Sequence, residues 1–95
     1  MNKYEALFIL RPNMEEETRV EAIEKFKSII ATDGEVLKVD EWGNRKLAYE
    51  IEKVKEGYYV LVDFNAAADL PAELERNFRI TDSVMRFMVI RKDAK

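Results

Sequence analysis

The first apolar pattern in the chain lies near the N-terminus and has the period of a β-strand. Between residues 3 and 11, one face of the predicted strand is wholly apolar and consists of Tyr4, Ala6, Phe8 and Leu10. The opposite face carries Glu5, Leu7 and Ile9 and is also mostly apolar. The pattern therefore predicts a strand whose second face is too apolar to be ordinary solvent surface.

The period changes to that of an amphipathic helix after Pro12-Asn13 ends this strand. The apolar stripe consists of Val20, Ala22, Ile23, Phe26, Ile29 and Ile30. Three successive glutamates, Glu15 to Glu17, place negative charge at the positive dipole end, and Asp33-Gly34 provides a C-terminal glycine. These features predict a helix from Glu15 to Thr32.

A second β pattern runs from Glu35 to Trp42 and leads into a long hairpin from Trp42 to Phe64. The first arm alternates apolar and polar positions through Leu47, Tyr49 and Ile51. The second arm follows Gly57 and ends near Asn65. Gly43-Asn44 interrupts the first arm, which predicts a bulge or bend that redirects Trp42 and Arg45.

A short helix and a final strand complete the predicted elements. Asp69 is a candidate N-cap and Pro71 suits the first helical turn. The apolar stripe of this helix, which should end near Arg79, consists of Leu70, Leu74 and Phe78. After a turn at Thr81-Asp82, the apolar and β-forming residues from Val84 to Arg91 predict a strand.

The resulting order is strand, helix, strand, strand, helix, strand, within one domain that spans residues 1–95. This order predicts an α+β fold of the ferredoxin-like βαββαβ type, a four-stranded antiparallel sheet with two helices on one face. The first and third strands should be central. The predicted core consists of Tyr4, Phe8, Phe26, Ile30, Val60, Phe64, Leu74, Phe78, Phe87 and Val89. The uncovered face of the sheet should present an apolar partner surface made of Leu7, Ile9, Tyr59, Leu61, Met88 and Ile90.

Composition excludes several classes of chemistry. The chain has no cysteine and no histidine, which removes disulfides, thiolate metal sites, the commonest metal ligand and the usual neutral-pH base. We therefore expect no metal and no cofactor. No run of about 18 apolar residues and no basic leader is present, so we expect a cytoplasmic protein that does not interact with membranes.

The formal net charge of -3 argues against nucleic-acid binding by bulk electrostatics alone. Local basic and aromatic residues on the hairpin and in the C-terminal segment are nevertheless candidates for RNA or partner contacts. They are Trp42, Arg45, Lys46, Tyr49, Arg79, Arg86 and Arg91. The alternative role of the charged residues is solubility, and Trp42 and Tyr49 are equally suited to cover the edge of the core.

Other functions remain possible on this fold. An RNA-recognition motif would match Gly57-Tyr58-Tyr59, but Glu56 occupies its basic position and a clear second motif is missing. An acylphosphatase-like enzyme would use an arginine and an asparagine, such as Arg11 or Arg19 with Asn13, although no phosphate-binding glycine loop lies near Arg11. A generic protein-interaction module is a third possibility.

Three separated motifs resemble one family, the bacterial small-subunit ribosomal protein six family. They are Trp42 to Ile51 (WGNRKLAYEI) followed by Lys55 to Tyr59, the N-terminal YEALFILRPN of Tyr4 to Asn13, and the stretch from Glu73 to Arg91. The resemblance covers essentially the whole chain. Glu50 departs from the pattern, because the family commonly has proline there.

The resemblance implies a structural, non-enzymatic component of the small ribosomal subunit. Members of the family bind the central domain of small-subunit ribosomal RNA as a heterodimer with ribosomal protein eighteen, which is basic. Such a partner would explain how an acidic chain takes part in RNA binding, since the partner contributes much of the phosphate neutralisation. No small-molecule substrate is implied.

Overall fold

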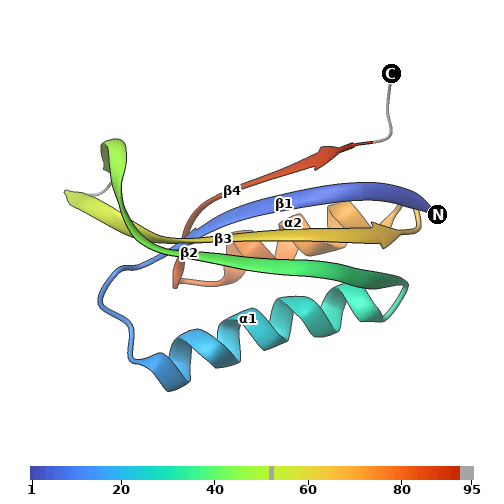
Figure 1. Cartoon of the computed structure of the whole chain (residues 1–95), viewed down its shortest axis with the longest axis horizontal. Helices are drawn as coiled ribbons and strands as arrows, with labels where there is room; N and C mark the ends of the chain where they lie inside the picture. Colours follow the sequence, from blue (N-terminus) through green and yellow to red (C-terminus); the bar gives the residue numbers. More distant parts are fainter. Residues whose placement is uncertain (52, 93–95) are drawn as a thin grey trace.

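The computed structural model describes residues 1–51 and 53–92, which form four strands and two helices in the expected order (Figure 1). Strands β1 (Asn2–Leu10), β2 (Gly34–Ile51), β3 (Val54–Ala66) and β4 (Val84–Arg91) make one antiparallel sheet in the order β2-β3-β1-β4. Helix α1 spans Glu16–Ala31 and α2 spans Leu70–Ile80. The predicted ferredoxin-like fold is confirmed, with β1 and β3 in the centre of the sheet.

The core lies between the helices and one face of the sheet. Tyr4, Ala6, Phe8 and Leu10 of β1 are all buried, as the alternation predicts. The ring of Phe8 lies 5.2 Å from that of Phe26 on α1 and 5.0 Å from that of Phe78 on α2. Both helices therefore pack on the same face. The opposite face, called the open face below, carries Glu5, Leu7, Ile9, Tyr59, Leu61, Asp63, Arg86, Met88 and Ile90.

Two details of the helices differ from the sequence predictions. Val20 was expected in the buried stripe of α1 but is 47% exposed. The neighbouring Arg19 contacts the sheet instead, with its guanidinium 4.4 Å from the centre of the Tyr58 ring. Asp69 occupies the N-cap position of α2 but makes no side-chain capping hydrogen bond. The apolar stripe of α2 is buried as predicted. Neither helix is long and apolar enough to cross a membrane.

Strand β2 is longer than expected, because it continues through the predicted break as one 18-residue strand. The predicted bulge is present. The β2–β3 register shifts between Glu41 and Gly43, and Gly43 has a φ of 84°, a left-handed value that favours glycine. A further shift between Lys46 and Ile51 leaves the end of the hairpin free to bend. The hairpin end extends beyond the helices and bends towards the β4 side of the sheet (Figure 1).

Candidate protein and nucleic-acid interface

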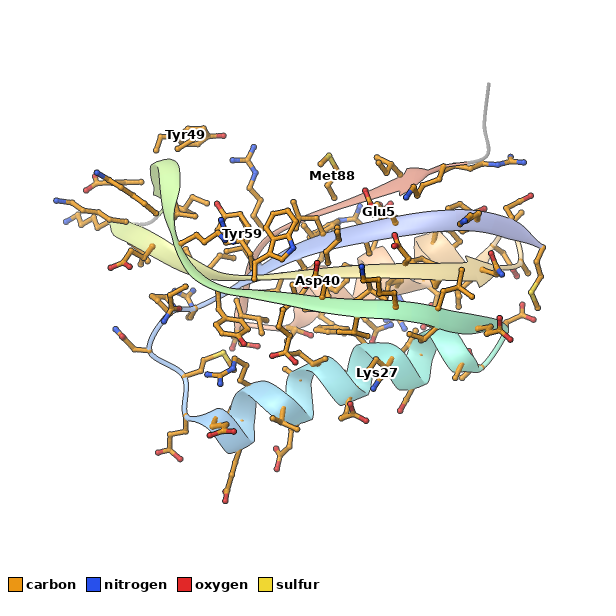
Figure 2. The ribbon with its side chains drawn as sticks, in the orientation of Figure 1. Glu5, Lys27, Asp40, Tyr49, Tyr59 and Met88 are labelled. Atoms are coloured by element: carbon orange, nitrogen blue, oxygen red, sulfur yellow. The ribbon has the colours of Figure 1, made fainter. Side chains whose placement is uncertain are left out.

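The open face contains an apolar depression at its centre. Its volume is about 390 Å³, and it is lined by Leu7, Ile9, Tyr59, Arg86, Phe87 and Met88. The registers of the central strands place Leu7 between Leu61 and Met88. Met88 is 54% exposed, and in Figure 2 it lies over the sheet, whereas Lys27 projects from α1. A contiguous apolar surface of this kind is typical of a protein docking site.

One predicted member of this surface, Ile9, is largely covered. Its exposed fraction is only 7%, and the adjacent Leu47 of the hairpin is buried as well. Gly57 lies above Ile9, and a Cβ atom at Gly57 would collide with Ile9 Cγ2 and lie 3.5 Å from Leu47 Cδ2. The close approach of the hairpin therefore requires glycine here. Ile9 contacts the base of the hairpin, and the exposed apolar part of the open face is smaller than the sequence indicated.

An aromatic stack with a cation lies beside the depression. The bulge at Gly43 places Trp42 over Tyr59, with ring centres 6.0 Å apart and planes 10° from parallel. The Arg45 guanidinium lies 5.3 Å from the centre of the Trp42 ring, and Trp42 Nε1 donates a hydrogen bond of 3.2 Å to Asp40. Exposed aromatic rings with an adjacent arginine are the groups on which single-stranded bases stack.

The end of the hairpin contacts the far edge of the sheet. Arg86 on β4 donates a hydrogen bond to the Tyr49 hydroxyl, and its guanidinium lies 5.2 Å from the centre of the Tyr49 ring. Tyr49 is otherwise exposed, and in Figure 2 it lies above the hairpin. Lys46 is exposed on the same hairpin. Arg86 and Tyr49, which are 37 positions apart in the sequence, therefore meet on the open-face side, whereas Lys46 is opposite Glu56 and alternates to the other side of the hairpin.

The other two predicted arginines lie elsewhere. Arg79 is on α2, where its guanidinium stacks 5.6 Å from the Phe87 ring centre and pairs with Glu75 at 3.3 Å. Arg91 is on the helix-facing side of β4, opposite Tyr4, and donates a hydrogen bond of 3.0 Å to Asn2. The structure thus separates Arg79 and Arg91 from the hairpin residues and from the open face.

Two carboxylates on the open face were not singled out by sequence reasoning as contact residues. Glu5 and Asp63 are directly opposite each other on β1 and β3, and Lys92 Nζ lies 3.5 Å from Glu5 and 3.8 Å from Asp63. The strand alternation predicted that both residues lie on this face, but only the β1–β3 register shows that they are directly opposite each other. Lys3 and Lys38 lie on the same face, beside Glu5 and opposite Asp63, so lysines surround this pair of carboxylates, while Arg45 and Arg86 lie at the hairpin end of the face.

On the other side of β3, a hydrogen bond fixes the strand just before the bulge. The Tyr58 hydroxyl donates a bond of 2.7 Å to Glu41, the residue that precedes Trp42. Burial raises the pKa of Tyr58, and the hydrogen bond to Glu41 and its negative charge raise it further, while Arg19 acts in the opposite direction. The folded protein thus binds this proton more tightly than the unfolded chain does.

Replacing Tyr58 with phenylalanine should therefore remove a pH-dependent contribution to stability. Because the pKa of Tyr58 is raised on folding, its contribution is complete below about pH 10, the unfolded value, and declines as the pH rises through the folded value. Urea denaturation at pH 8 and at pH 11 measures the effect. The stability difference between wild type and Tyr58→Phe should shrink at pH 11, and a difference that grows would contradict the interpretation.

The alternative enzymatic site lies around Arg11 and Asn13, at the end of β1. Arg11 Nε donates a hydrogen bond of 3.0 Å to the carbonyl oxygen of Asp82, and its backbone amide bonds to the carbonyl of Ser83. Arg11 therefore ties the end of β1 to the loop before β4. These two contacts give Arg11 a structural role in holding the loop before β4.

Comparison with known proteins gives a consistent result over the full chain. The family model described as Ribosomal protein S6 matches residues 3–91. The chain is 59% identical over 91 residues to the small ribosomal subunit protein bS6 of Alkaliphilus oremlandii, covering 96% of this chain and 97% of that one. It is 62% identical over 91 residues to the protein of the same name from Clostridium novyi, covering 95% and 96%.

A solved structure shows the same fold. The crystal structure of 30S ribosomal protein S6 from Thermotoga maritima superposes with a TM-score of 0.90, at 38% sequence identity, covering 96% of this chain and 87% of that one. The match includes the sheet, both helices and thus the face left uncovered by them. Together with the family model and the close relatives, it shows that this chain belongs to the ribosomal protein S6 family.

Proposed function

We propose that the protein binds the central domain of small-subunit ribosomal RNA together with ribosomal protein eighteen, as a heterodimer docked through the open face. As a member of the S6 family, the protein is a structural component of the small ribosomal subunit in the cytoplasm and is not an enzyme. The observation that carries the finer proposal is the exposed apolar surface around Met88 and Leu7, next to a basic and aromatic hairpin.

The apolar part of the open face supports docking of a protein. Leu7, Leu61 and Met88 align across three strands, and Met88 and Ile90 remain exposed on the edge strand β4. Phosphate groups gain nothing from apolar side chains, whereas a protein surface that covers them is stabilised by roughly 25 cal/mol per Å² of apolar area. We therefore assign Leu7, Tyr59, Leu61, Met88 and Ile90 to the protein partner.

The hairpin supports contact with RNA. Arg45 and Lys46 supply positive charge, and the Trp42 ring that lies beside Arg45 offers a face for a base. Arg86 and Tyr49 extend the same side of the molecule to β4. This set is small, which agrees with the net charge of -3 and with a need for a basic partner. Arg79 and Arg91 lie away from this side, and we propose that they contact RNA only at the periphery of the complex.

Co-binding predicts that RNA affinity depends on the partner. A labelled fragment of the RNA central domain, titrated in a filter-binding assay, should bind the heterodimer at least about tenfold more tightly than it binds this chain alone, since the partner adds phosphate contacts. Tight, salt-insensitive binding by the isolated chain would contradict the proposal. A partner that binds this chain without any gain in RNA affinity would indicate a protein-interaction module instead.

Replacing Arg45 with glutamine in the heterodimer should weaken RNA binding and lower the slope of log affinity against log salt by about 0.7–0.9, the value for one lost phosphate contact. Lys27→Gln is the matched control, because Lys27 lies on α1 and pairs with Glu24 at 2.9 Å. This control should leave the slope unchanged. Equal effects of the two substitutions would indicate that Arg45 acts only through the net charge.

A further inference from the structure

The end of the β2–β3 hairpin depends little on its own strand pairing. Regular pairing of the two strands reaches Lys46, opposite Glu56, and among the described residues the next pair is Ile51 with Val54, after a register shift. The hairpin end also extends beyond the part of the sheet that the helices cover (Figure 1). A two-stranded ribbon is only marginally stable by itself, so the conformation of this end depends on its contacts with the sheet.

Two side-chain contacts bring the hairpin back across the open face. At its base, Leu47 is only 8% exposed and lies with Gly57 against Ile9 of β1. Two positions further along, the Tyr49 hydroxyl accepts a hydrogen bond from Arg86, whose guanidinium lies 5.2 Å from the centre of the Tyr49 ring. Because Arg86 is directly opposite Ile9 in the β1–β4 register, the hairpin passes over β1 and ends on the edge strand β4.

The Tyr49–Arg86 contact lies at the surface of the molecule. Tyr49 is 61% exposed, and Arg86 is exposed as well. A cation–π contact at an exposed site shifts a conformational equilibrium by roughly twofold to fivefold. This is too little to determine the fold of the sheet, but it is enough to favour the bent form of a loosely paired hairpin.

Resting on the proposed function, we propose that Tyr49 and Arg86 are positioning residues that hold the hairpin bent across the open face before RNA binds. Arg45 and Trp42 belong to the same hairpin, and its bend determines how they meet the RNA. Ordering a flexible segment on binding lowers affinity, whereas a segment already held in its bound form avoids this cost. Arg86 thus assists RNA binding through Tyr49, and its guanidinium does not itself contact a phosphate.

Amide hydrogen exchange in the free, full-length chain tests the Tyr49–Arg86 contact without any partner. Tyr49→Ala should accelerate exchange of the protected hairpin amides at 44–47 and 56–58 about threefold, while the amides of β1 keep their wild-type rates. Glu50→Ala is the matched control, because Glu50 is the next residue on the hairpin and pairs only with Lys55 at 4.0 Å among the described residues. Wild-type exchange in Tyr49→Ala, or an equal acceleration in Glu50→Ala, overturns the proposal.

A double-mutant cycle in RNA binding distinguishes this contact from two independent RNA contacts. The heterodimer with ribosomal protein eighteen is titrated with the labelled central-domain fragment, for wild type, Tyr49→Ala, Arg86→Gln and the double variant. Each single substitution should weaken binding about threefold, and the double variant should bind as each single variant does, because both remove the same interaction. The slope of log affinity against log salt should stay unchanged in Arg86→Gln, since no phosphate contact is lost.

Arg86→Lys completes the test, because lysine keeps a cation that can lie over the Tyr49 ring. It should restore most of the affinity lost in Arg86→Gln when Tyr49 is present, and none of it in Tyr49→Ala. Losses that multiply in the double variant, or a slope that falls by about 0.7–0.9 in Arg86→Gln, would place Arg86 directly on RNA and overturn the proposal. Absence of RNA binding by the wild-type heterodimer would instead refute the proposed function, and the exchange measurement would still decide whether Tyr49 and Arg86 hold the hairpin.

Discussion

Replacing Phe64 with alanine is expected to lower the free energy of unfolding by about 3–5 kcal/mol, the usual cost of deleting a fully buried phenyl ring. Phe64 is completely buried on β3, and its ring stacks on that of Tyr4 at a centroid distance of 5.5 Å. The substitution removes this contact and leaves a cavity that rigid neighbouring strands cannot fill. Urea denaturation followed by circular dichroism measures the loss as a lower midpoint at an unchanged m-value.

Ile80→Ala is the control for this substitution. Ile80 ends α2 and is 62% exposed, so its truncation should change stability by no more than about 0.5 kcal/mol. A loss of less than about 1 kcal/mol in Phe64→Ala would be too small for a core residue and would contradict the packing between β3 and the helices. A changed m-value would indicate that the denatured state, and not only the core, was affected.

Replacing Met88 with aspartate should reduce the affinity for ribosomal protein eighteen by about a hundredfold, which corresponds to roughly 2.7 kcal/mol. Met88 is exposed in the free chain, so the carboxylate remains hydrated there and folding should be preserved. In the proposed complex the partner covers this position, and the charge then loses its hydration. Calorimetric titration measures the affinity, and thermal unfolding of the free variant verifies its fold.

Ile80→Asp introduces the same charge at a similarly exposed site on α2, away from the open face. It should bind the partner as wild type does, even if the unfavourable charge at a helix C-terminus lowers stability by a few tenths of a kcal/mol. Equal losses in both variants would show that net charge governs the affinity. Full affinity in Met88→Asp would show that the partner docks on a different surface.

The fold followed from the sequence because each element carries a strong local pattern. The alternation in β1 and the α2 stripe of Leu70, Leu74 and Phe78 have the positions that the pattern predicted, whereas Gly34 begins β2 instead of capping α1, whose C-cap is Thr32. Period 2 and period 3.6 each direct one set of side chains into the core, so the buried faces of both types of element were predictable. The bulge at Gly43 was predictable for a similar reason, since a left-handed φ favours glycine.

The contact residues were harder to predict, because sequence spacing does not report which elements fold over others. Ile9 lies on the open face and lines its depression, as expected, but the sequence did not show that Leu47 and Gly57 of the hairpin leave only 7% of it exposed. Arg86 and Tyr49 are 37 positions apart and meet only because the hairpin bends. Arg79 and Arg45 were equally plausible contact residues in the sequence, but Arg79 lies on α2 beside Phe87 and Arg45 lies on the hairpin beside Trp42.

The sequence by itself determined the order of elements, the core face of each one, the absence of cysteine and histidine chemistry, and the family. These properties depend on the local hydrophobic period and on residue types, both of which can be read from one sequence. Only the tertiary structure decided that Glu5 opposes Asp63, that Lys92 lies near both, and that Arg45 and Arg86 lie at the hairpin end of the open face. Strand register and hairpin bending arise from packing between distant segments, so which side chains share each end of the open face is a property of the fold.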